Sequence, residues 1–322
     1  MIIVTGGAGF IGSCIVGRLN ADGYKDLIIV DHLAEGDHKK ENLKNKAFIK
    51  YYEKDAFLEL IRKNKLDGKV ETMIHMGACS STTGDDVQYY EKNNFEYSCH
   101  MVPWALDHQV RFIYASSAAT YGDGRFGYKD DDDTTRKLVP LNVYGASKQK
   151  FDQWILEKGY INRVVGLKFF NVFGPNEYHK GDMRSVIAKS FERVVQDGKI
   201  ALFRSYKKDF ANGEQRRDFI YVKDAVDIVM YFLKNPPVNG IYNVGTGEAR
   251  SWNDLAKALF AAAGKPLNIQ YIEMPDRLKD KYQYVTQADI TKLRKAGYKT
   301  PFTSLEEAVQ DYVKYLKTNG HA

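Results

Sequence analysis

The chain has 322 residues, of which 44% are hydrophobic and 27% are charged, and its formal net charge at pH 7 is +6. This is the composition of a globular protein with a large core, and the basic residues are spread along the chain without forming a nucleic-acid-binding patch. No run reaches the ~20 apolar residues of a membrane span. Cys14, Cys79 and Cys99 form no C-x-x-C pair, so we expect free thiols in the cytoplasm and no metal site.

Strand and helix patterns alternate through the first half of the chain. Strands are expected at Met1–Thr5, Leu27–Asp31, Ala47–Tyr52, Val70–Met76, Val110–Ser116 and Arg163–Phe169. Helices are expected at Phe10–Ala21, Val87–His108 and Val143–Lys158. The alternation predicts an α/β fold, a doubly wound parallel sheet of the Rossmann type with helices on both faces and right-handed crossovers.

After Asn171 the segments become shorter, and loops containing Gly, Pro and Asn separate them. Helices are expected at Ser185–Gln196, Asp224–Lys234, Trp252–Ala263 and Thr303–Lys317. We expect residues 1–172 to form a dinucleotide-binding domain, with 219–245 returning to it. Residues 173–218 and 246–322 would form a smaller substrate-binding lobe. The acidic run Lys129–Asp133 is expected to be a solvated loop.

Residues 6–12, with the sequence G-G-A-G-F-I-G, connect the first expected strand to the first expected helix. Glycine is needed here for the tight turn, for the approach of the backbone to a pyrophosphate, and for close packing of helix and strand. Asp31 ends the second strand and could bind the adenosine ribose, which favours NAD. His32, Lys39 and Lys54 could instead meet the 2′-phosphate of NADP, so this choice stays open.

Tyr144 and Lys148 are four residues apart in an expected helix, so their side chains share one face. A free tyrosine, with a pKa near ~10, is a poor base at neutral pH. A nearby ammonium and a cationic nicotinamide would lower this pKa, and a shift of ~3 units corresponds to roughly 4 kcal/mol. Tyr144 could then take a hydroxyl proton while a hydride leaves the same carbon. Ser117, after the strand Val110–Ser116, could hydrogen-bond the reacting oxygen.

Together these motifs resemble the extended short-chain dehydrogenase/reductases, and further segments narrow the resemblance to the ADP-L-glycero-D-manno-heptose 6-epimerases. The narrowing segments are residues 77–83 (G-A-C-S-S-T-T), 140–145 (P-L-N-V-Y-G), 170–175 (F-N-V-F-G-P), 179–181 (H-K-G), 217–219 (R-D-F) and 282–289 (Y-Q-Y-V-T-Q-A-D). The resemblance runs from Met1 to about Leu316. It implies inversion at C6 of an ADP-heptose by transient oxidation with tightly bound NADP, one per subunit of a homo-oligomer, a pentamer. Such enzymes supply the heptose precursor of bacterial lipopolysaccharide.

The resemblance also implies roles for single residues. Tyr144 and Lys180 would be the acid/base pair, one for each face of the sugar. Lys148 would hold the nicotinamide ribose and Ser117 the reacting oxygen. The implied cofactor-binding residues are Gly6, Gly9, Phe10, Ile11, Gly12, Asp31, His32, Lys39, Lys54, Met76, Gly77, Ala78, Cys79, Ser80, Asn93, Lys148, Val172 and Lys180. The implied substrate-binding residues are Asn171, Asp182, Lys189, Phe203, Arg217 and Tyr282.

Four residues depart from the family pattern. His32 and Met76 bear on the preference for NADP or NAD, and Asp182 and Lys189 bear on the substrate contacts. One alternative is another nucleotide-sugar epimerase, such as a UDP-hexose 4-epimerase. A 4,6-dehydratase is disfavoured because Ala118-Ala119, which follow Ser117, cannot supply its acid/base chemistry. A catalytically silent dinucleotide sensor would not need the Ser117, Tyr144 and Lys148 set.

Overall fold

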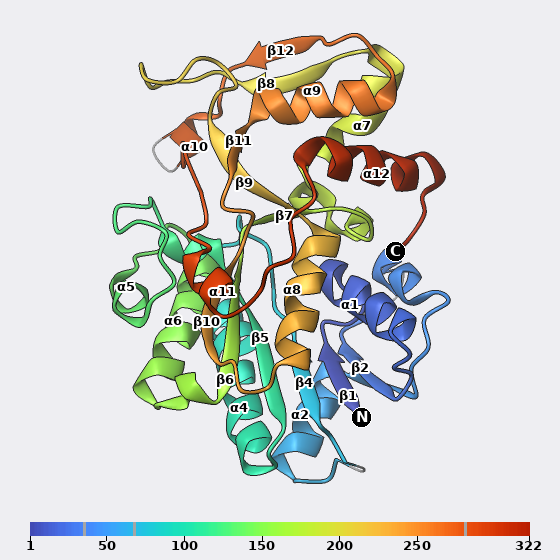
Figure 1. The fold of residues 1–322 in the computed structure, drawn as a ribbon, viewed down its shortest axis with the longest axis vertical. Helices are drawn as coiled ribbons and strands as arrows, with labels where there is room; N and C mark the ends of the chain where they lie inside the picture. Colours follow the sequence, from blue (N-terminus) through green and yellow to red (C-terminus); the bar gives the residue numbers. More distant parts are fainter. Residues whose placement is uncertain (35–36, 67–68, 280–281) are drawn as a thin grey trace.

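Seven parallel strands form the central sheet of the protein, whose computed structural model describes residues 1–34, 37–66, 69–279 and 282–322 (Figure 1). The strands are β1 (Ile2–Thr5), β2 (Leu27–Asp31), β3 (Lys50–Glu53), β4 (Thr72–His75), β5 (Arg111–Ser117), β6 (Val164–Phe169) and β10 (Gly240–Val244). Their order across the sheet is β10-β6-β5-β4-β1-β2-β3. The chain reverses direction across the sheet between β1 and β4, and ligands of such sheets bind at the carboxyl ends of the strands beside this point.

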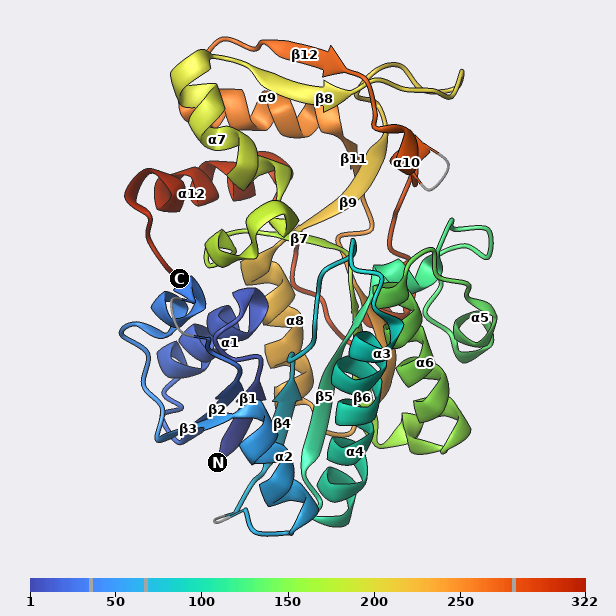
Figure 2. The same ribbon diagram turned by 180° about the vertical axis from the view of Figure 1, so that it is seen from behind.

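Helices cover both faces of this sheet, as its apolar strands require. Helices α1 (Phe10–Ala21) and α8 (Val222–Lys234) lie together on the face toward the viewer in Figure 1. Helices α2 (Lys54–Arg62), α4 (Tyr97–Asp107) and α6 (Val143–Glu157) lie on the face toward the viewer in Figure 2. One buried cluster contains side chains of α1, α8 and the smaller lobe, and a second contains side chains of α2, α4 and α6.

The smaller lobe stands above the carboxyl ends of the strands (Figure 1). Its helices α7 (Val186–Asp197), α9 (Trp252–Ala263) and α12 (Leu305–Thr318) pack on one another. Strands β8 (Ile200–Phe203) and β12 (Ile269–Ile272) form a parallel pair, while β7 (Asn171–Phe173), β9 (Arg216–Tyr221) and β11 (Ala249–Ser251) form a three-stranded sheet. The short elements are η1 (His38–Leu43), α3 (Val87–Tyr90), η2 (Glu91–Glu96), η3 (Ala118–Tyr121), α5 (Asp132–Lys137), η4 (Tyr160–Asn162), η5 (Tyr178–Met183), α10 (Asp276–Lys279) and α11 (Thr291–Lys295). Within the described residues, no helix is long and apolar enough to cross a membrane.

The predicted elements of the first half are largely confirmed. Helix α1 and strand β2 have the predicted bounds, but β3 begins at Lys50, later than predicted. The predicted helix Val87–His108 consists of α3, α4 and, between them, η2, a wide π-helical segment. Segments of this kind occur often at functional sites.

The expectation of a solvated loop at Lys129–Asp133 holds only in part, since Lys129, Asp131 and Asp133 are exposed but Asp130 is buried and α5 begins at Asp132. Asp130 is 3% exposed and accepts a hydrogen bond from the backbone N–H of Asn243 at 2.8 Å. Asp131 accepts from the Thr134 N–H at 2.7 Å and so caps α5, which begins at Asp132. The acidic side chains are therefore used for a helix N-terminus and a buried contact, both of which satisfy backbone donors.

Candidate active site

The glycine turn before α1 is compact in a way that only glycine permits. Gly6 has φ +64°, and a Cβ there would lie 2.7 Å from the backbone nitrogen of Gly77. A Cβ on Gly12 would lie 2.1 Å from the carbonyl oxygen of Gly6. Gly9 provides no side-chain cap to α1, and the first turn of α1 carries no acidic residue. The N-terminal amides of α1 therefore suit a phosphate group, which fits a dinucleotide.

Asp31, at the end of β2, is 8% exposed and is already engaged by the protein. Its Oδ2 accepts from the Ala8 N–H in the glycine turn, and its Oδ1 accepts from Lys39 Nζ, both at 2.8 Å. The neighbouring His32 is exposed and pairs with Glu53 at 2.7 Å. Asp31 thus orients the glycine turn and brings a lysine to the end of β2, next to the position where an adenosine ribose would lie.

Two contacts join the η2 segment to the other cofactor residues. Lys54 Nζ donates to Asn93 Oδ1 at 2.8 Å, so these two predicted residues lie together. The turn after β4, residues 76–80, approaches Gly6 and is held by Thr5, whose Oγ1 accepts from the Gly77 N–H at 3.1 Å. Asn94 binds the backbone of Cys79 in the same turn. The structure therefore brings together predicted cofactor residues from β1, β2, β4 and η2.

The candidate reacting groups lie where α6 meets the end of β5. Lys148 is 5% exposed, and its Nζ donates to the carbonyl oxygen of Ala115 in β5 at 2.8 Å. Tyr144 lies one turn earlier on α6, and the nearby Ser117 hydroxyl acts to lower the pKa of its phenol. The Ser117 Oγ also accepts from the Ala119 N–H at 3.1 Å and caps η3. Ser117 therefore has both a structural contact and a contact to the phenol.

The pKa of Tyr144 is shifted in the direction opposite to the one that the sequence predicted. Burial raises the pKa of Tyr144, although the hydrogen bond from Ser117 acts in the opposite direction. Burial lowers the pKa of Lys148 to about 8, against the attraction of Asp152. The predicted lowering of the Tyr144 pKa is therefore not a property of the protein alone, because desolvation of the phenolate outweighs the neighbouring groups.

Lys180 lies in η5, and its ammonium is 5.4 Å from the ring centroid of Phe10 at the start of α1. This contact brings the H-K-G segment to the glycine turn. Burial lowers the pKa of Lys180, while the charge of Glu177 acts in the opposite direction. Val172 lies in β7, between β6 and η5 in the chain. A partly desolvated lysine whose pKa is lowered is suited to proton transfer near neutral pH.

Aromatic side chains of the smaller lobe surround Arg217. The guanidinium of Arg217 lies 5.0 Å from the ring centroid of Tyr282 and 5.8 Å from that of Trp252. Phe203 packs edge-on against Tyr282 at 6.5 Å. Arg217 is 8% exposed, and its Nη1 donates to the carbonyl oxygen of Arg216 at 2.8 Å. A planar cation held between rings is well oriented for two phosphate oxygens.

The remaining predicted substrate residues lie on β7, which pairs with the strand of Arg217, and in or beside η5. Asn171 is an exposed residue of β7 whose Oδ1 accepts from Thr286 Oγ1 at 3.4 Å. Asp182 and Lys189 are exposed and contact each other, since Lys189 Nζ donates to the carbonyl oxygen of Asp182 at 3.2 Å. These two residues, which depart from the family pattern, therefore form a contact of their own beside η5.

Sequence reasoning missed several residues that hold this region together. Trp252 was predicted only as the start of a helix, and Glu177, Asn94 and Asp152 were not singled out. Asp152 follows Lys148 by four residues on α6, so its spacing could have revealed it.

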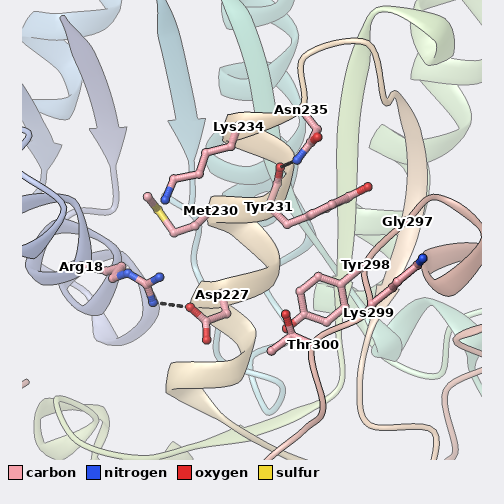
Figure 3. A pocket seen from close by; sticks show the side chains of 10 residues that line it. All are labelled: Arg18, Asp227, Met230, Tyr231, Lys234, Asn235, Gly297, Tyr298, Lys299 and Thr300. Carbon is pink, nitrogen blue, oxygen red and sulfur yellow. Dashed lines mark hydrogen bonds and ion pairs between the residues drawn. The ribbon is translucent and has the colours of Figure 1, made fainter.

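A surface hollow of about 520 Å³ lies apart from these residues, beside α8 (Figure 3). It is lined by Asp227, Met230 and Tyr231 of α8, by residues 297–300 and by Arg18, which pairs with Asp227. None of the predicted site residues lines it.

Comparisons with known proteins agree with this geometry. The family described as the NAD dependent epimerase/dehydratase family matches residues 2–245. The ADP-L-glycero-D-manno-heptose-6-epimerase of Nitratidesulfovibrio vulgaris (strain DP4) is 50% identical over 314 residues, covering 98% of this chain and 97% of that protein. The crystal structure of the Helicobacter pylori enzyme of the same name is 28% identical, with a TM-score of 0.81 and coverage of 98% and 96%. A Thermus thermophilus UDP-glucose 4-epimerase in complex with NAD is 25% identical, with a TM-score of 0.76 and coverage of 98% for both chains. The chain belongs to the NAD-dependent epimerase/dehydratase family and, within it, to the ADP-L-glycero-D-manno-heptose-6-epimerases.

Proposed function

We propose that the protein converts ADP-D-glycero-β-D-manno-heptose into ADP-L-glycero-β-D-manno-heptose by transient oxidation at C6. The observation that carries this proposal is the placement of Tyr144 and Lys148 on α6 against the end of β5, where Lys148 Nζ donates to the Ala115 carbonyl oxygen and Ser117 acts to lower the pKa of Tyr144. The 50% identity to an enzyme named for this reaction supplies the substrate. A bound nicotinamide dinucleotide would supply the acceptor and donor of the hydride.

Tyr144 and Ser117 would act on the C6 oxygen. Tyr144 takes the hydroxyl proton as the C6 hydride leaves, and it returns a proton to the same oxygen when a hydride comes back. Ser117 fixes the position of that oxygen, and the Lys148 ammonium favours the phenolate form of Tyr144. Because Lys148 has a pKa of about 8 through burial, its ammonium state, and with it this support, is present below that pH.

Epimerisation requires the ketone to be reduced from the face opposite to the one that lost the hydride. Lys180 would serve as the acid/base group for this second face. Its place beside Phe10 and the lowering of its pKa by burial support this role. Arg217 and Tyr282, with Phe203 and Asn171, would hold the ADP part of the substrate, while Asp182 and Lys189 would meet it at its edge.

NADP is the cofactor that we propose. Asp31 alone would favour NAD, but Lys39 and Lys54 bring two ammonium groups close to the ribose side of the site, where they could bind a 2′-phosphate. Gly6, Gly9, Phe10, Ile11 and Gly12 would hold the pyrophosphate, and Met76, Gly77, Ala78, Cys79, Ser80, Asn93 and Val172 would complete the cofactor site. Denaturing the purified protein and analysing what it releases tests this choice: NADP is expected, and NAD alone would contradict it.

The proposal extends to the whole molecule. Residues 1–172 and 219–245 would bind the dinucleotide, and residues 173–218 and 246–322 would bind the sugar nucleotide. The protein would work in the cytoplasm as a homo-oligomer, a pentamer, with one cofactor held tightly in each subunit.

The decisive experiment is incubation of the purified protein with ADP-D-glycero-β-D-manno-heptose, without added cofactor, while NMR follows the C6 configuration. Formation of an equilibrium mixture of both epimers is expected, because the cofactor is regenerated in each turnover. If no ADP-L-glycero-β-D-manno-heptose forms even when NADP and NAD are supplied, the proposed function is contradicted. UDP-galactose is then the next substrate to test, since a UDP-glucose 4-epimerase shares this fold.

A further inference from the structure

A fully buried ion pair lies directly beneath the candidate reacting groups. Asp152 of α6 and Lys168 of β6 both have side chains that are 0% exposed, and Lys168 Nζ lies 2.6 Å from Asp152 Oδ2. Neither residue reaches the surface or contacts the proposed substrate site. Asp152 is one helical turn beyond Lys148, and Lys148 in turn is one turn beyond Tyr144.

Every further contact of this pair leads to the end of β5 or to η3 after it. Ser116 Oγ donates to Asp152 at 2.6 Å, and the Tyr114 hydroxyl donates to its other carboxylate oxygen at 2.9 Å. Lys168 also donates to Thr120 Oγ1 at 2.9 Å. Thr120 Oγ1 donates in turn to the carbonyl oxygen of Ser117 at 2.7 Å.

The packing around the pair is tight. A Cβ on Gly166 of β6 would lie 2.5 Å from the Tyr114 hydroxyl, so the absence of a side chain there makes room for the Tyr114 contact. The Lys168 ammonium lies 5.3 Å from the ring centroid of Tyr121. The donors and acceptors of the pair are thus used by named partners, as a buried ion pair requires.

Stability alone does not account for such a pair. Desolvation of two buried charges offsets most of their attraction, and well-packed apolar residues of similar volume often stabilise a fold equally well. What an apolar pair cannot do is fix the rotation and height of α6 relative to β5 through directional hydrogen bonds.

We infer that Asp152 and Lys168 are positioning residues for the proposed reaction, which lock the Tyr144 and Lys148 face of α6 onto the Ser117 end of β5. This inference rests on the proposed function. The pair reaches the reacting groups from both sides, through α6 on the Asp152 side and through Thr120 and the Ser117 backbone on the Lys168 side.

Asp152 also contributes a charge. The charged and titratable groups that act on Lys148 are Asp152 on α6, Cys79 in the turn after β4 and His75 on β4, and Tyr144 lies one turn away on the same helix. Burial keeps His75 neutral by lowering its pKa to about 3. The negative charge of Asp152 therefore favours the Lys148 ammonium, and its loss would lower the Lys148 pKa further, so that the ammonium disappears at a lower pH.

The test compares wild-type holoenzyme with the double variant D152N/K168M, which removes both charges and leaves no unpaired buried ion. We expect kcat to fall to about one tenth of the wild-type value or below, because the reacting groups lose their alignment. KM should change by no more than about threefold and the cofactor content should stay the same, because the substrate and cofactor contacts are kept. The alkaline limb of the kcat profile should move to lower pH by about half a unit or more. Asp224→Asn is the matched control, since it alters a buried carboxylate of α8 that holds Thr303, outside α6 and β6, and it should leave kcat and the profile unchanged.

A second measurement is independent of the substrate. In protein labelled with ¹⁵N-lysine, the Lys148 resonance, assigned with a Lys148→Met variant, should titrate at lower pH in D152N/K168M. A wild-type titration of Lys148 together with a wild-type kcat would overturn the inference while leaving the proposed function intact. A wild type that is inactive on the ADP-heptose would overturn the function and, with it, the positioning role in that reaction. If D152N/K168M does not melt cooperatively, Tyr114→Phe/Ser116→Ala removes both hydrogen bonds from β5 to Asp152 and leaves the ion pair in place, and a wild-type kcat in that variant would overturn the inference.

Discussion

The amide side chain of Asn94 binds the backbone of Cys79 from two sides: its Oδ1 accepts from the Cys79 N–H at 2.8 Å, and its Nδ2 donates to the Cys79 carbonyl oxygen at 3.0 Å. Nδ2 also donates to Ser147 Oγ at 3.0 Å. Ser147 stands between Tyr144 and Lys148 in the chain. One buried amide therefore connects the turn after β4, where we place the cofactor, to the helix that carries the reacting groups.

This relationship predicts that Asn94→Asp destabilises the protein and weakens cofactor retention. A carboxylate keeps the contact to the Cys79 N–H but places acceptors against the Cys79 carbonyl and against Ser147. Because Asn94 is 1% exposed, we expect the free energy of unfolding to fall by about 2 kcal/mol or more. Asn93→Asp is the control, since the neighbouring Asn93 is only partly buried and its Oδ1 meets Lys54. Equal urea midpoints for the two variants would contradict the prediction.

Local signals in the sequence account for much of the fold. Helix α9 has its predicted bounds because Ser251 and Asp254 form a capping box at its start and Gly264 adopts a left-handed conformation at its end. The spacing of the glycines also predicted the turn before α1, because the backbone of residues 6–12 lies too close to neighbouring backbone atoms for a Cβ at Gly6 or Gly12. These features depend on residues close together in the chain.

Features that depend on distant residues could not be predicted. The spacing of apolar residues along 87–108 does not indicate the π-helical turn, in which Asn93 contacts Lys54 and Asn94 contacts Cys79. The pKa of Tyr144 depends on burial by the folded chain, which spacing does not reveal. Arg217 was predicted to bind the substrate, but the two aromatic side chains that hold its guanidinium come from residues 252 and 282, which are distant from it in the chain.

Tyr144→Phe should lower turnover of the ADP-heptose at least about a hundredfold, because the C6 hydroxyl loses its proton acceptor. The ring and its packing are kept, so cofactor content and melting temperature should match those of the wild type. Tyr89→Phe is the control, since Tyr89 is 51% exposed, and this variant should turn over the substrate at the wild-type rate. Near-normal turnover of Tyr144→Phe would exclude Tyr144 as the acid/base group.

Lys180→Met should also reduce epimerisation about a hundredfold or more, because one face of the ketone would lack a proton donor. The methionine chain keeps an apolar contact with Phe10. Lys295→Met, at an exposed lysine of α11, is the control for loss of one positive charge. Full activity of Lys180→Met would mean that a single group serves both faces and that the intermediate turns within the site.

Asp130 makes stability depend on pH with a sign opposite to that of most carboxylates. Burial raises its pKa from 3.8 to about 6, so between these values the folded protein holds a proton that the unfolded chain releases. Stability from this group is therefore complete below pH 4 and is lost as pH rises through 6, by about 3 kcal/mol in total.

Asp130→Asn removes this dependence while keeping an oxygen acceptor for the Asn243 N–H. Urea unfolding between pH 4 and 7.5 should show the variant gaining stability relative to wild type as pH rises, most steeply near pH ~5, midway between the two pKa values, and levelling off above pH ~6. Asp131→Asn is the neighbouring control: the hydrogen bond from the Thr134 N–H holds the Asp131 pKa below its usual value, so that group is ionised across most of this range and its difference from wild type should stay nearly flat. A flat difference for Asp130→Asn as well would mean that the Asp130 carboxyl ionises in the folded protein as it does in water, and it would contradict the prediction. The 3% exposure of Asp130, and a pKa that burial raises in spite of the charge of Lys292, argue against that outcome.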